Sequence, residues 1–454
     1  MGATHTTRVL ILGGGFGGLY AAMELEKTLG KSPGVEITLV NKENYFLFTP
    51  LLHEVAAGDL DVTHTVNPLR LLLRRARFFN GEVESIDLDR RRVVVSHGEQ
   101  HHRHDMPYDH LLIALGAVTN FRDLPGEERA VTMKSLDDAI RLRNRLIELL
   151  EAADFDCVPG SRDPLMTVVV AGGGFAGVET IASINDFFRG ALKHYPNVRE
   201  EMIRLVLVHA GEFILPELGG ALGAYARRKL GGRGVEVRTE TTVTSYVDGV
   251  AALSDGTRIP AETLIWTAGI TPNPMLAGLP CEKHLGRIVV NRFLEVPGYP
   301  GVWALGDCAR VPDAAQGSSC PPTAQHALRQ GRVAGRNIAA RVRGGTPHPF
   351  AYSSIGALAA IGRRCGVARI LGVNFSGFIA WWMWRTVYLG KLPRFEKKFR
   401  VALDWTLDLV FGKDLVQFQT HRAAPASRPA RQSAAPEGMG AIVMGQEDER
   451  SSPE

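Results

Sequence analysis

The sequence predicts an α/β protein built from two related units and a helical C-terminal region. The chain of 454 residues is 45% hydrophobic and 22% charged, which is ordinary for a folded protein of two or three domains. A strand-like run, a glycine cluster and a helical pattern follow one another near the N-terminus, and the same succession returns at about residue 165. From about residue 351 the character changes, and four of the six tryptophans lie within 381–405.

The first unit begins with the apolar run Arg8–Leu12, which is rich in β-forming residues. This run stops at the cluster Gly13–Gly18, and apolar residues then recur at helical spacing from Leu19 to Leu29. Val35–Val40 has the pattern of a second strand. The order of strand, glycine turn, helix and strand predicts a βαβ unit.

Gly13, Gly15 and Gly18 have the GxGxxG spacing of a dinucleotide-binding turn. In such a turn the first glycine makes the bend, the second lets the backbone approach a pyrophosphate, and the third lets helix and strand pack closely. The helix that begins with Phe16 and Gly17 offers free N–H groups to the phosphates. We therefore predict a dinucleotide site at this turn.

The residue that usually binds the ribose is an acid at the end of the next strand. Here Asn41 occupies that position, followed by Lys42 and Glu43. Because an amide can still hydrogen-bond a hydroxyl, we predict that Asn41 and Lys42 belong to the cofactor site. The alternative is that Asn41 is only a turn residue.

A second GxGxxG follows the apolar run Leu165–Ala171. Its glycines are Gly172, Gly174 and Gly177. The next strand, Ile203–Val208, ends at His209, where an acid would again be expected. No arginine lies next to His209 to attract a 2′-phosphate, so the sequence favours NADH, with NADPH as the alternative.

Two other buried-looking strands end at glycines. Asp109–Leu115 ends at Gly116, just after Ala114, and Thr263–Thr267 leads into Gly269. Glycine after a strand allows a sharp change of direction. We predict that these junctions are the crossings between the two units and that Ala114, Gly116 and Gly269 line the cofactor sites.

A third late strand, Val302–Leu305, ends at Gly306 and Asp307. An acid there can hold a ribityl hydroxyl of a flavin. Two complete dinucleotide sites imply two cofactors, and FAD with a nicotinamide nucleotide make sense together. We therefore predict two Rossmann-like domains, one inserted in the other. Their bounds are 1–125 with 290–350 for FAD, and 165–290 for NAD(P)H.

The C-terminal region, 351–420, is predicted to be helical and to associate with a membrane, with helices at about 376–391 and 395–411. In the second helix, apolar residues share one face at i, i+4 spacing, while most charged residues lie elsewhere. These apolar residues are Phe395, Phe399, Leu403, Leu407, Val410 and Phe411. Packing on the protein's own core or at a dimer contact is the alternative. The tail, 423–454, is predicted to be disordered.

Charge and cysteine content exclude several classes of function. The balance of 52 basic and 48 acidic residues is weak and gives no indication of a nucleic-acid partner. Five cysteines without a CxxC pair argue against a disulfide framework or a metal site. The sequence has no stretch of 18 uncharged apolar residues, so it predicts no membrane-spanning helix. It also shows no signal-peptide pattern.

Together these motifs resemble the type II NADH dehydrogenases, single-chain NADH:quinone oxidoreductases that do not pump protons. The resemblance covers about residues 7–418. Its more specific parts are NYFLFTPLLHEVA at 44–56, Pro322–Ala327 with Gln330 and Gly331, and the tryptophan-rich C-terminus. It implies FAD and NADH as cofactors and a membrane quinone as acceptor. The missing signal-peptide pattern and the C-terminal helices predict a peripheral position on the cytoplasmic face of the cell membrane. Whether the chain forms a homodimer is left open.

The resemblance also implies roles for two residues. Glu179 matches the glutamate between the nicotinamide and quinone sites, and Gln325, which follows Ala324, matches the glutamine near the quinone ring. Considered alone, Glu179 has a simpler explanation, because a carboxylate in the first turn of a helix is favoured by the helix dipole. Arg329 departs from the family pattern, since a glutamine often precedes Gln330.

Two other functions are compatible with the sequence. A sulfide:quinone oxidoreductase would share the flavin fold and the membrane helices but needs reactive cysteines, for which Cys157, Cys320 and Cys365 are candidates. A flavoprotein that uses its cofactors to stabilise a binding or signalling surface would explain the missing acids at 41 and 209. The intact second fingerprint favours the NADH-dependent enzyme.

Overall fold

The computed structural model describes residues 6–155, 162–313, 317–408, 410–411 and 413–418. The predicted disordered tail at 423–454 and the candidate Cys157 lie outside these residues. Within the part of the chain that the structure describes, no helix is both long enough and apolar enough to cross a membrane.

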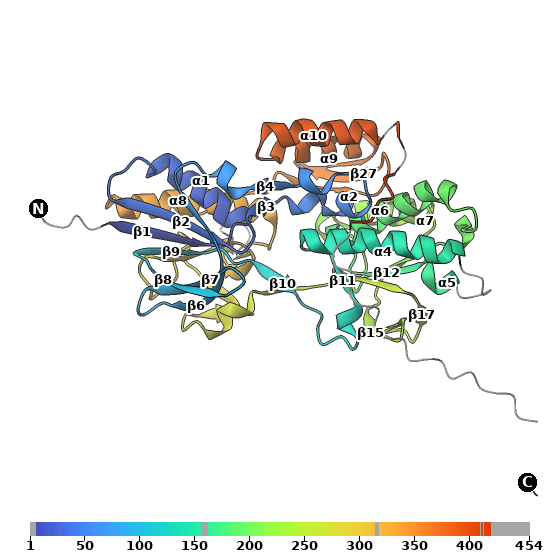
Figure 1. Cartoon of the computed structure of the whole chain (residues 1–454), viewed down its shortest axis with the longest axis horizontal. Coiled ribbons are helices and arrows are strands. Elements are labelled where there is room, and N and C mark those ends of the chain that lie inside the picture. Colours follow the sequence, from blue (N-terminus) through green and yellow to red (C-terminus); the bar gives the residue numbers. More distant parts are fainter. Residues whose placement is uncertain (1–5, 156–161, 314–316, 409, 412, 419–454) are drawn as a thin grey trace, which may run out of the picture. The chain divides into compact units, whose positions relative to one another are not determined.

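Five parallel strands form the first sheet, in the order β22-β9-β1-β2-β5 (Figure 1). Its strands are β1 (Thr7–Leu12), β2 (Val35–Asn41), β5 (Arg77–Asn80), β9 (His110–Ile113) and β22 (Val302–Ala304). Ile11 pairs with Leu39 on one side and Leu112 on the other, and all three are fully buried. The apolar run predicted as the first strand is therefore the centre of a parallel sheet covered on both faces. β22 joins this sheet from late in the chain, so the second unit is inserted in the first, as predicted.

Two helices cross this sheet in close contact, α1 (Phe16–Thr28) and α8 (Ala324–Val342). Glycine makes the approach possible, because a Cβ on Gly331 would lie 2.2 Å from the carbonyl oxygen of Gly17. The packing places the N-terminus of α8, with Ala324 and Gln325, near the first glycine turn.

The second sheet repeats the arrangement, with five parallel strands in the order β11-β18-β12-β13-β14. Its strands are β11 (Val131–Thr132), β12 (Thr167–Ala171), β13 (Arg204–Val208), β14 (Val235–Arg238) and β18 (Thr263–Trp266). Its helices are α4 (Leu136–Phe155), α5 (Arg162–Leu165), α6 (Phe175–Ala191) and α7 (Gly220–Gly231). The internal duplication predicted from the two glycine clusters is thus confirmed.

The chain crosses between the units along a two-stranded antiparallel ribbon, β10 (Ala117–Thr119) with β19 (Ile270–Pro272) (Figure 1). These strands directly follow Gly116 and Gly269. The crossings predicted at the two glycines are confirmed, and they run side by side.

Each unit also contains a small antiparallel sheet. Alternating stretches in the sequence become β6 (Glu82–Asp87), β7 (Arg92–His97) and β8 (His102–Pro107) in one, and β15 (Val243–Val247), β16 (Val250–Leu253) and β17 (Arg258–Pro260) in the other. The segment after β2 contains β3 (Tyr45–Leu47), α2 (Leu52–Ala56), β4 (Val66–Pro68) and α3 (Leu69–Leu72). Shorter strands follow between residues 283 and 319. They are β20 (Lys283–His284), β21 (Arg287–Val289), β23 (Ala309–Arg310), β24 (Pro312–Asp313) and β25 (Ser318–Ser319).

The C-terminal region is only partly helical, which corrects the prediction. A three-stranded antiparallel sheet of β26 (Gly356–Ala360), β27 (Gly366–Ile370) and β28 (Val373–Gly377) precedes α9 (Phe378–Lys391) and α10 (Phe395–Leu407). The strands are short and rich in glycine and alanine, so their sequences carry no clear period of two. The last helix also ends at Leu407 and not near residue 411.

Candidate active site

The first glycine turn has the geometry of a phosphate-binding loop. Gly13 has φ +100°, and a Cβ there would lie 2.4 Å from the carbonyl oxygen of Ala114. A Cβ on Gly18 would lie 1.9 Å from the carbonyl oxygen of Gly13, whereas a Cβ on Gly15 would meet nothing within 4 Å. The outer two glycines are therefore required by packing, and the middle one leaves room at the N-terminus of α1. This room fits a pyrophosphate.

The second turn repeats these relations. Gly172 has φ +114°, and a Cβ on Gly177 would lie 1.8 Å from the carbonyl oxygen of Gly172. Gly174, which precedes the first residue of α6, again has open space at its Cβ position. Both cradles fit a dinucleotide.

The two residues that replace the expected acids play the same part in the two units. Asn41 accepts a hydrogen bond from the Gly14 N–H through Oδ1 at 2.8 Å, and His209 accepts one from the Gly173 N–H through Nδ1 at 3.1 Å. Each side chain braces its glycine loop. Burial lowers the pKa of His209, which keeps the imidazole a neutral acceptor. Binding of ribose by Asn41 or by its neighbour Lys42 stays a prediction.

Gly306 and Asp307 follow β22 at the edge of the first sheet. Gly306 has φ +74°, and its N–H donates to Oε1 of Gln330 at 2.8 Å. Burial raises the pKa of Asp307, which the nearby Lys134 ammonium counteracts. Lys134 was not expected from the sequence, because it lies between the predicted domains.

Glu179 lies in the second turn of α6, fully surrounded by protein. Its Oε1 accepts a hydrogen bond from the Ala360 N–H at 3.0 Å and one from Nε1 of Trp384 at 2.9 Å. Burial raises the pKa of Glu179 to about 8. The helix-capping explanation is wrong, because α6 begins at Phe175 and the first turn contains no acid.

His53 is the nearest titratable neighbour of this carboxyl group. Its Nε2 lies 3.8 Å from Oε2 of Glu179, and its Nδ1 shares a hydrogen bond with Oγ of Ser183 at 2.9 Å. Burial lowers the pKa of His53 to about 3, so the ring is neutral. His53 and Glu179 can be read from the sequence, but no pattern in the sequence indicates that α2 packs against α6.

Glu54 forms a second carboxyl site beside the first. Its Oε2 accepts a hydrogen bond from Nε1 of Trp405 at 2.8 Å, and burial raises the pKa of Glu54 to about 7, against the charges of Arg385 and Lys413. The rings of Trp384 and Trp405 lie 6.1 Å apart. Two helices that were interpreted as membrane elements therefore also hold two buried acids.

Gln325 lies at the start of α8, among residues of another segment. Its Oε1 accepts a hydrogen bond from the Tyr352 hydroxyl at 3.0 Å, and its Nε2 donates to Oγ of Ser354 at 3.3 Å. Arg329 donates to the carbonyl oxygen of Gln325 at 2.9 Å, and its guanidinium lies 4.0 Å from the centroid of the Tyr352 ring. Arg329, which departs from the family pattern, thus stabilises the backbone of Gln325.

Glu179 and Gln325 do not hydrogen-bond each other, but α9 spans the distance between them. Tyr388 packs on Trp384 with ring centroids 4.9 Å apart, and the charge of Glu179 adds to the burial that raises the pKa of Tyr388. Lys391, at the end of α9, lies 5.3 Å from the centroid of the Tyr388 ring. Burial lowers the pKa of Lys391, and the Arg329 guanidinium lowers it further. Within the described ranges, no group of three or more His, Cys, Asp or Glu residues is placed to hold a metal ion.

Comparison with known proteins agrees with this geometry. Residues 7–331 match the family model for pyridine nucleotide-disulphide oxidoreductases, and residues 355–414 match the NDH2 C-terminal domain. The type II NADH:quinone oxidoreductase Ndh of Mycobacterium tuberculosis is 34% identical over 420 residues, covering 88% of this chain and 87% of the relative. A probable NADH dehydrogenase of Dictyostelium discoideum is 32% identical over 422 residues, covering 90% and 91%.

A solved structure shares the whole fold. NDH2 from Plasmodium falciparum in complex with NADH superposes with a TM-score of 0.84 at 19% identity, covering 91% of this chain and 100% of that one. The sulfide:quinone oxidoreductase from Aquifex aeolicus reaches a TM-score of 0.65 at 19% identity, with coverage of 84% and 90%. From the two family matches and the sequence identities, this chain belongs to the type II NADH:quinone oxidoreductases, within the pyridine nucleotide-disulphide oxidoreductases.

Proposed function

We propose that this chain oxidises NADH and reduces a membrane quinone, with FAD as the resident cofactor. The observation that carries the proposal is the pair of open glycine cradles, one in each parallel sheet, with the buried Glu179 beside the C-terminal helices. Bound FAD supplies the chemistry that accepts a hydride from NADH and releases two electrons to a quinone. The relatives named above carry the same activity in their names.

The two glycine cradles bind different nucleotides, FAD in the first unit and NADH in the second. Gly13, Gly15 and Gly18 would hold the pyrophosphate of FAD at the N-terminus of α1, and Asp307 would accept a hydrogen bond from its ribityl chain. The equivalent glycines after β12 hold NADH at the N-terminus of α6. This division is supported by β22 and its Gly306–Asp307 junction, which belong to the first sheet.

Glu179 holds the proton that quinone reduction needs. Because burial raises its pKa to about 8, the carboxyl group is protonated at neutral pH and can donate. The neutral His53 beside it does not compete for that proton, since its pKa lies near 3. Gln325 is the second residue that we assign to the quinone pocket, where its amide is fixed by Tyr352 and Ser354.

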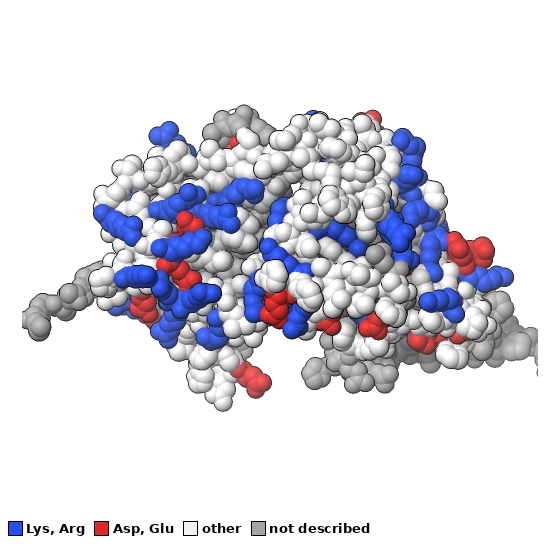
Figure 2. All heavy atoms as spheres, turned by 90° about the horizontal axis from the view of Figure 1, so that it is seen from above, with Lys and Arg blue, Asp and Glu red and all other residues white. Residues whose placement is uncertain are grey.

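The outer face of α10 supports a peripheral position on the membrane. The apolar row Phe395, Phe399, Leu403 and Leu407 is exposed by 83, 64, 46 and 44%, while Val401 and Trp405 face the protein. Packing of the row on the protein's own core is thereby contradicted. On the face that carries α9 and α10, Lys and Arg gather around an uncharged area (Figure 2). We place this face on the cytoplasmic side of the cell membrane, and a homodimer through the same row is the competing use of the surface.

Anaerobic stopped-flow spectroscopy of the purified flavoprotein tests the proposal. NADH should bleach the flavin band rapidly and a short-chain quinone should restore it, while NADPH should bleach it more slowly. Failure of NADH to bleach the flavin would mean that the second cradle is not a working hydride site. Fast turnover would also eliminate a slow binding or signalling module.

The sulfide-oxidising alternative is not favoured. Burial raises the pKa of Cys308 and of Cys320 to about 11, which opposes a reactive thiolate. Cys281 is buried as well, and no described cysteine is paired with another. A Cys320→Ser variant should oxidise NADH at the normal rate, and loss of that activity would revive a thiol mechanism.

A further inference from the structure

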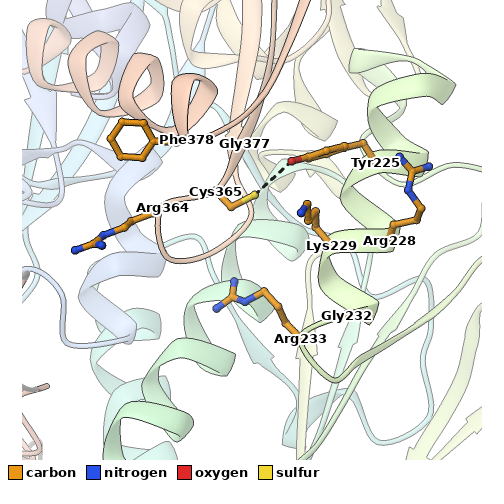
Figure 3. Close-up of a pocket in the computed structure, with 9 residues that line it drawn as sticks. All are labelled: Tyr225, Arg228, Lys229, Gly232, Arg233, Arg364, Cys365, Gly377 and Phe378. Carbon is orange, nitrogen blue, oxygen red and sulfur yellow. Dashed lines mark hydrogen bonds between the residues drawn. The ribbon is translucent and has the colours of Figure 1, made fainter.

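A basic pocket of about 610 Å³ lies where α7 meets the C-terminal sheet (Figure 3). Its walls come from α7, from the turn between β26 and β27, and from the junction of β28 and α9. It is lined by Tyr225, Arg228, Lys229, Arg233, Arg364, Cys365 and Phe378, with Gly232 and Gly377. In Figure 3 the side chains of Lys229 and Arg233 point towards Cys365, and Arg228 and Arg364 flank the pocket on opposite sides.

One of the four cations is already compensated. Arg233 forms an ion pair with Asp186 and donates to the carbonyl oxygen of Ile361 at 2.9 Å, so it fixes the pocket wall. The others are exposed, and among the described residues no carboxylate lies within ion-pair distance of Arg228, Lys229 or Arg364. Three uncompensated cations around one hollow make a strongly positive potential.

The pocket opens beside apolar side chains that point away from the protein. Phe378, at its edge, is 58% exposed, and Ile379 and Trp382, which follow it on α9, are exposed by 60 and 58%. A ligand that fits both features has an anionic head and an apolar tail. Hydrated phosphate alone would leave the apolar edge without a partner.

We propose that this pocket binds the phosphate head of an anionic phospholipid, with the acyl chains along Phe378, Ile379 and Trp382. The proposal deepens the membrane part of the proposed function and rests on it. It places one specific lipid contact at the N-terminus of α9, apart from the glycine cradles and from Glu179. Arginine suits a phosphate ester because its fork donates two parallel hydrogen bonds.

Cys365 gives a direct readout of occupancy, because it lies in the pocket and is half-buried, whereas Cys281, Cys308 and Cys320 are buried. The full chain with Cys157→Ser would be alkylated with a thiol reagent in three conditions. These are vesicles of phosphatidylcholine alone, vesicles of phosphatidylcholine with phosphatidylglycerol, and glycerol 1-phosphate without lipid. The rate of labelling is proportional to the fraction of pockets that hold no lipid. We therefore expect this rate to decrease about tenfold when the mixed vesicles are present at ten times their Kd.

A charge-matched pair of variants separates the pocket from general attraction. Lys229→Gln with Arg364→Gln should weaken binding to mixed vesicles by roughly fivefold for each cation and should abolish protection of Cys365. Arg90→Gln with Arg258→Gln removes the same charge near β6 and β17, on the opposite side from α9 and α10 in Figure 1, and should preserve protection. Flavin absorbance and NADH oxidation with a soluble quinone confirm that each variant is folded.

The outcomes are distinct. Mixed vesicles that bind the chain without protecting Cys365 would overturn the pocket while leaving membrane association intact. Protection by glycerol 1-phosphate without vesicle binding would overturn the lipid as the source and identify a site for a free phosphate ester. Soluble-quinone activity in the same samples reports the proposed redox function independently of either result.

Discussion

Glu179 and Glu54 are each held by the indole N–H of a tryptophan, Trp384 and Trp405, from two successive C-terminal helices. Glu179 could be singled out from the sequence only through the family resemblance. Its partners were not predictable, because Ala360 and Trp384 are 181 and 205 residues away along the chain. By contrast, the roles of the glycines were predictable, since they depend on local backbone geometry alone.

Replacing Glu179 by glutamine should leave reduction of the flavin by NADH intact and slow its reoxidation by quinone by roughly 100-fold or more. In the wild type the carboxyl group is protonated below its pKa of about 8, so reoxidation should decline as the pH rises above 8. The variant should lack this decline. Single-turnover reoxidation between pH 6 and 9 measures both effects.

Glu201→Gln is a matched control, because Glu201 is exposed on the same domain. Stability gives a second readout. A carboxyl group whose pKa is raised from 4.5 by folding destabilises the protein as the pH rises from 4.5 through 8. Glu179→Gln should therefore raise the Tm more at pH 9 than at pH 5, and an equal change at both would contradict the raised pKa.

We expect His209 to make NADH binding sensitive to acid. Protonation removes the Nδ1 acceptor that holds the Gly173 N–H, and burial lowers the pKa of His209, so the loss should begin below the ordinary range of histidine. We expect the Kd for NADH to rise about fivefold there, the value of one hydrogen bond of ~1 kcal/mol. Isothermal titration across acidic pH measures it.

The corresponding position in the first unit supplies the control. His209→Asn copies Asn41, which makes the same bond and does not titrate. The variant should bind NADH with little dependence on acidic pH. A persistent acid effect would show that another group is responsible.

At the level of elements, the two strand–turn–helix units were predictable because each glycine has a fixed task in a recurring geometry. The C-terminal sheet was not. Gly356–Ala360 reads GALAA, and alanine has no preference for a strand. β26 is extended because it pairs with β27 and presents the Ala360 N–H to Glu179, and both partners are tertiary.

The two glycines of the second turn should separate binding from stability. Gly174→Ala places a methyl group in open space within the cradle, so we expect a stability change below about 0.5 kcal/mol and at least a tenfold loss of NADH affinity. Gly177→Ala drives a methyl group against the carbonyl oxygen of Gly172 and should cost about 1–3 kcal/mol. Chemical denaturation and NADH titration measure the two effects, with FAD content as a check.

Gly231→Ala is the control for the pair. Gly231 ends α7, and a Cβ there meets nothing within 4 Å. This variant should change neither stability nor NADH affinity appreciably. A loss of affinity like that of Gly174→Ala would remove the second cradle as its cause.

At the scale of the whole molecule, the insertion of one unit in the other could be predicted from Gly306–Asp307, whose strand pairs with β9. The assembly of the site from α2, α6, α9 and α10 could not. Glu54 and Trp405, for example, are 351 residues apart and meet only because the C-terminal helices fold back onto α2. No periodicity in either segment encodes that contact.

Phe399→Glu should release the chain from the membrane without harming catalysis in solution. Phe399 is 64% exposed on α10, whereas Trp405, which holds Glu54, is buried on the other face of the same helix. We expect vesicle flotation to fall at least tenfold and NADH oxidation with a soluble quinone to stay normal. Leu285→Glu, at a residue that is 84% exposed between β20 and β21, is the matched control and should float normally.

One helix, α9, carries Trp384 on its inner face and Phe378, Ile379 and Trp382 on its outer face. In the proposed position on the membrane, a quinone dissolved in the bilayer would reach the site across the width of one helix, about 10 Å, without entering bulk water. Substrate supply then becomes a two-dimensional problem, governed by surface dilution. The rate per enzyme should follow the mole fraction of quinone among the lipids, and diluting the vesicles with buffer should leave it unchanged.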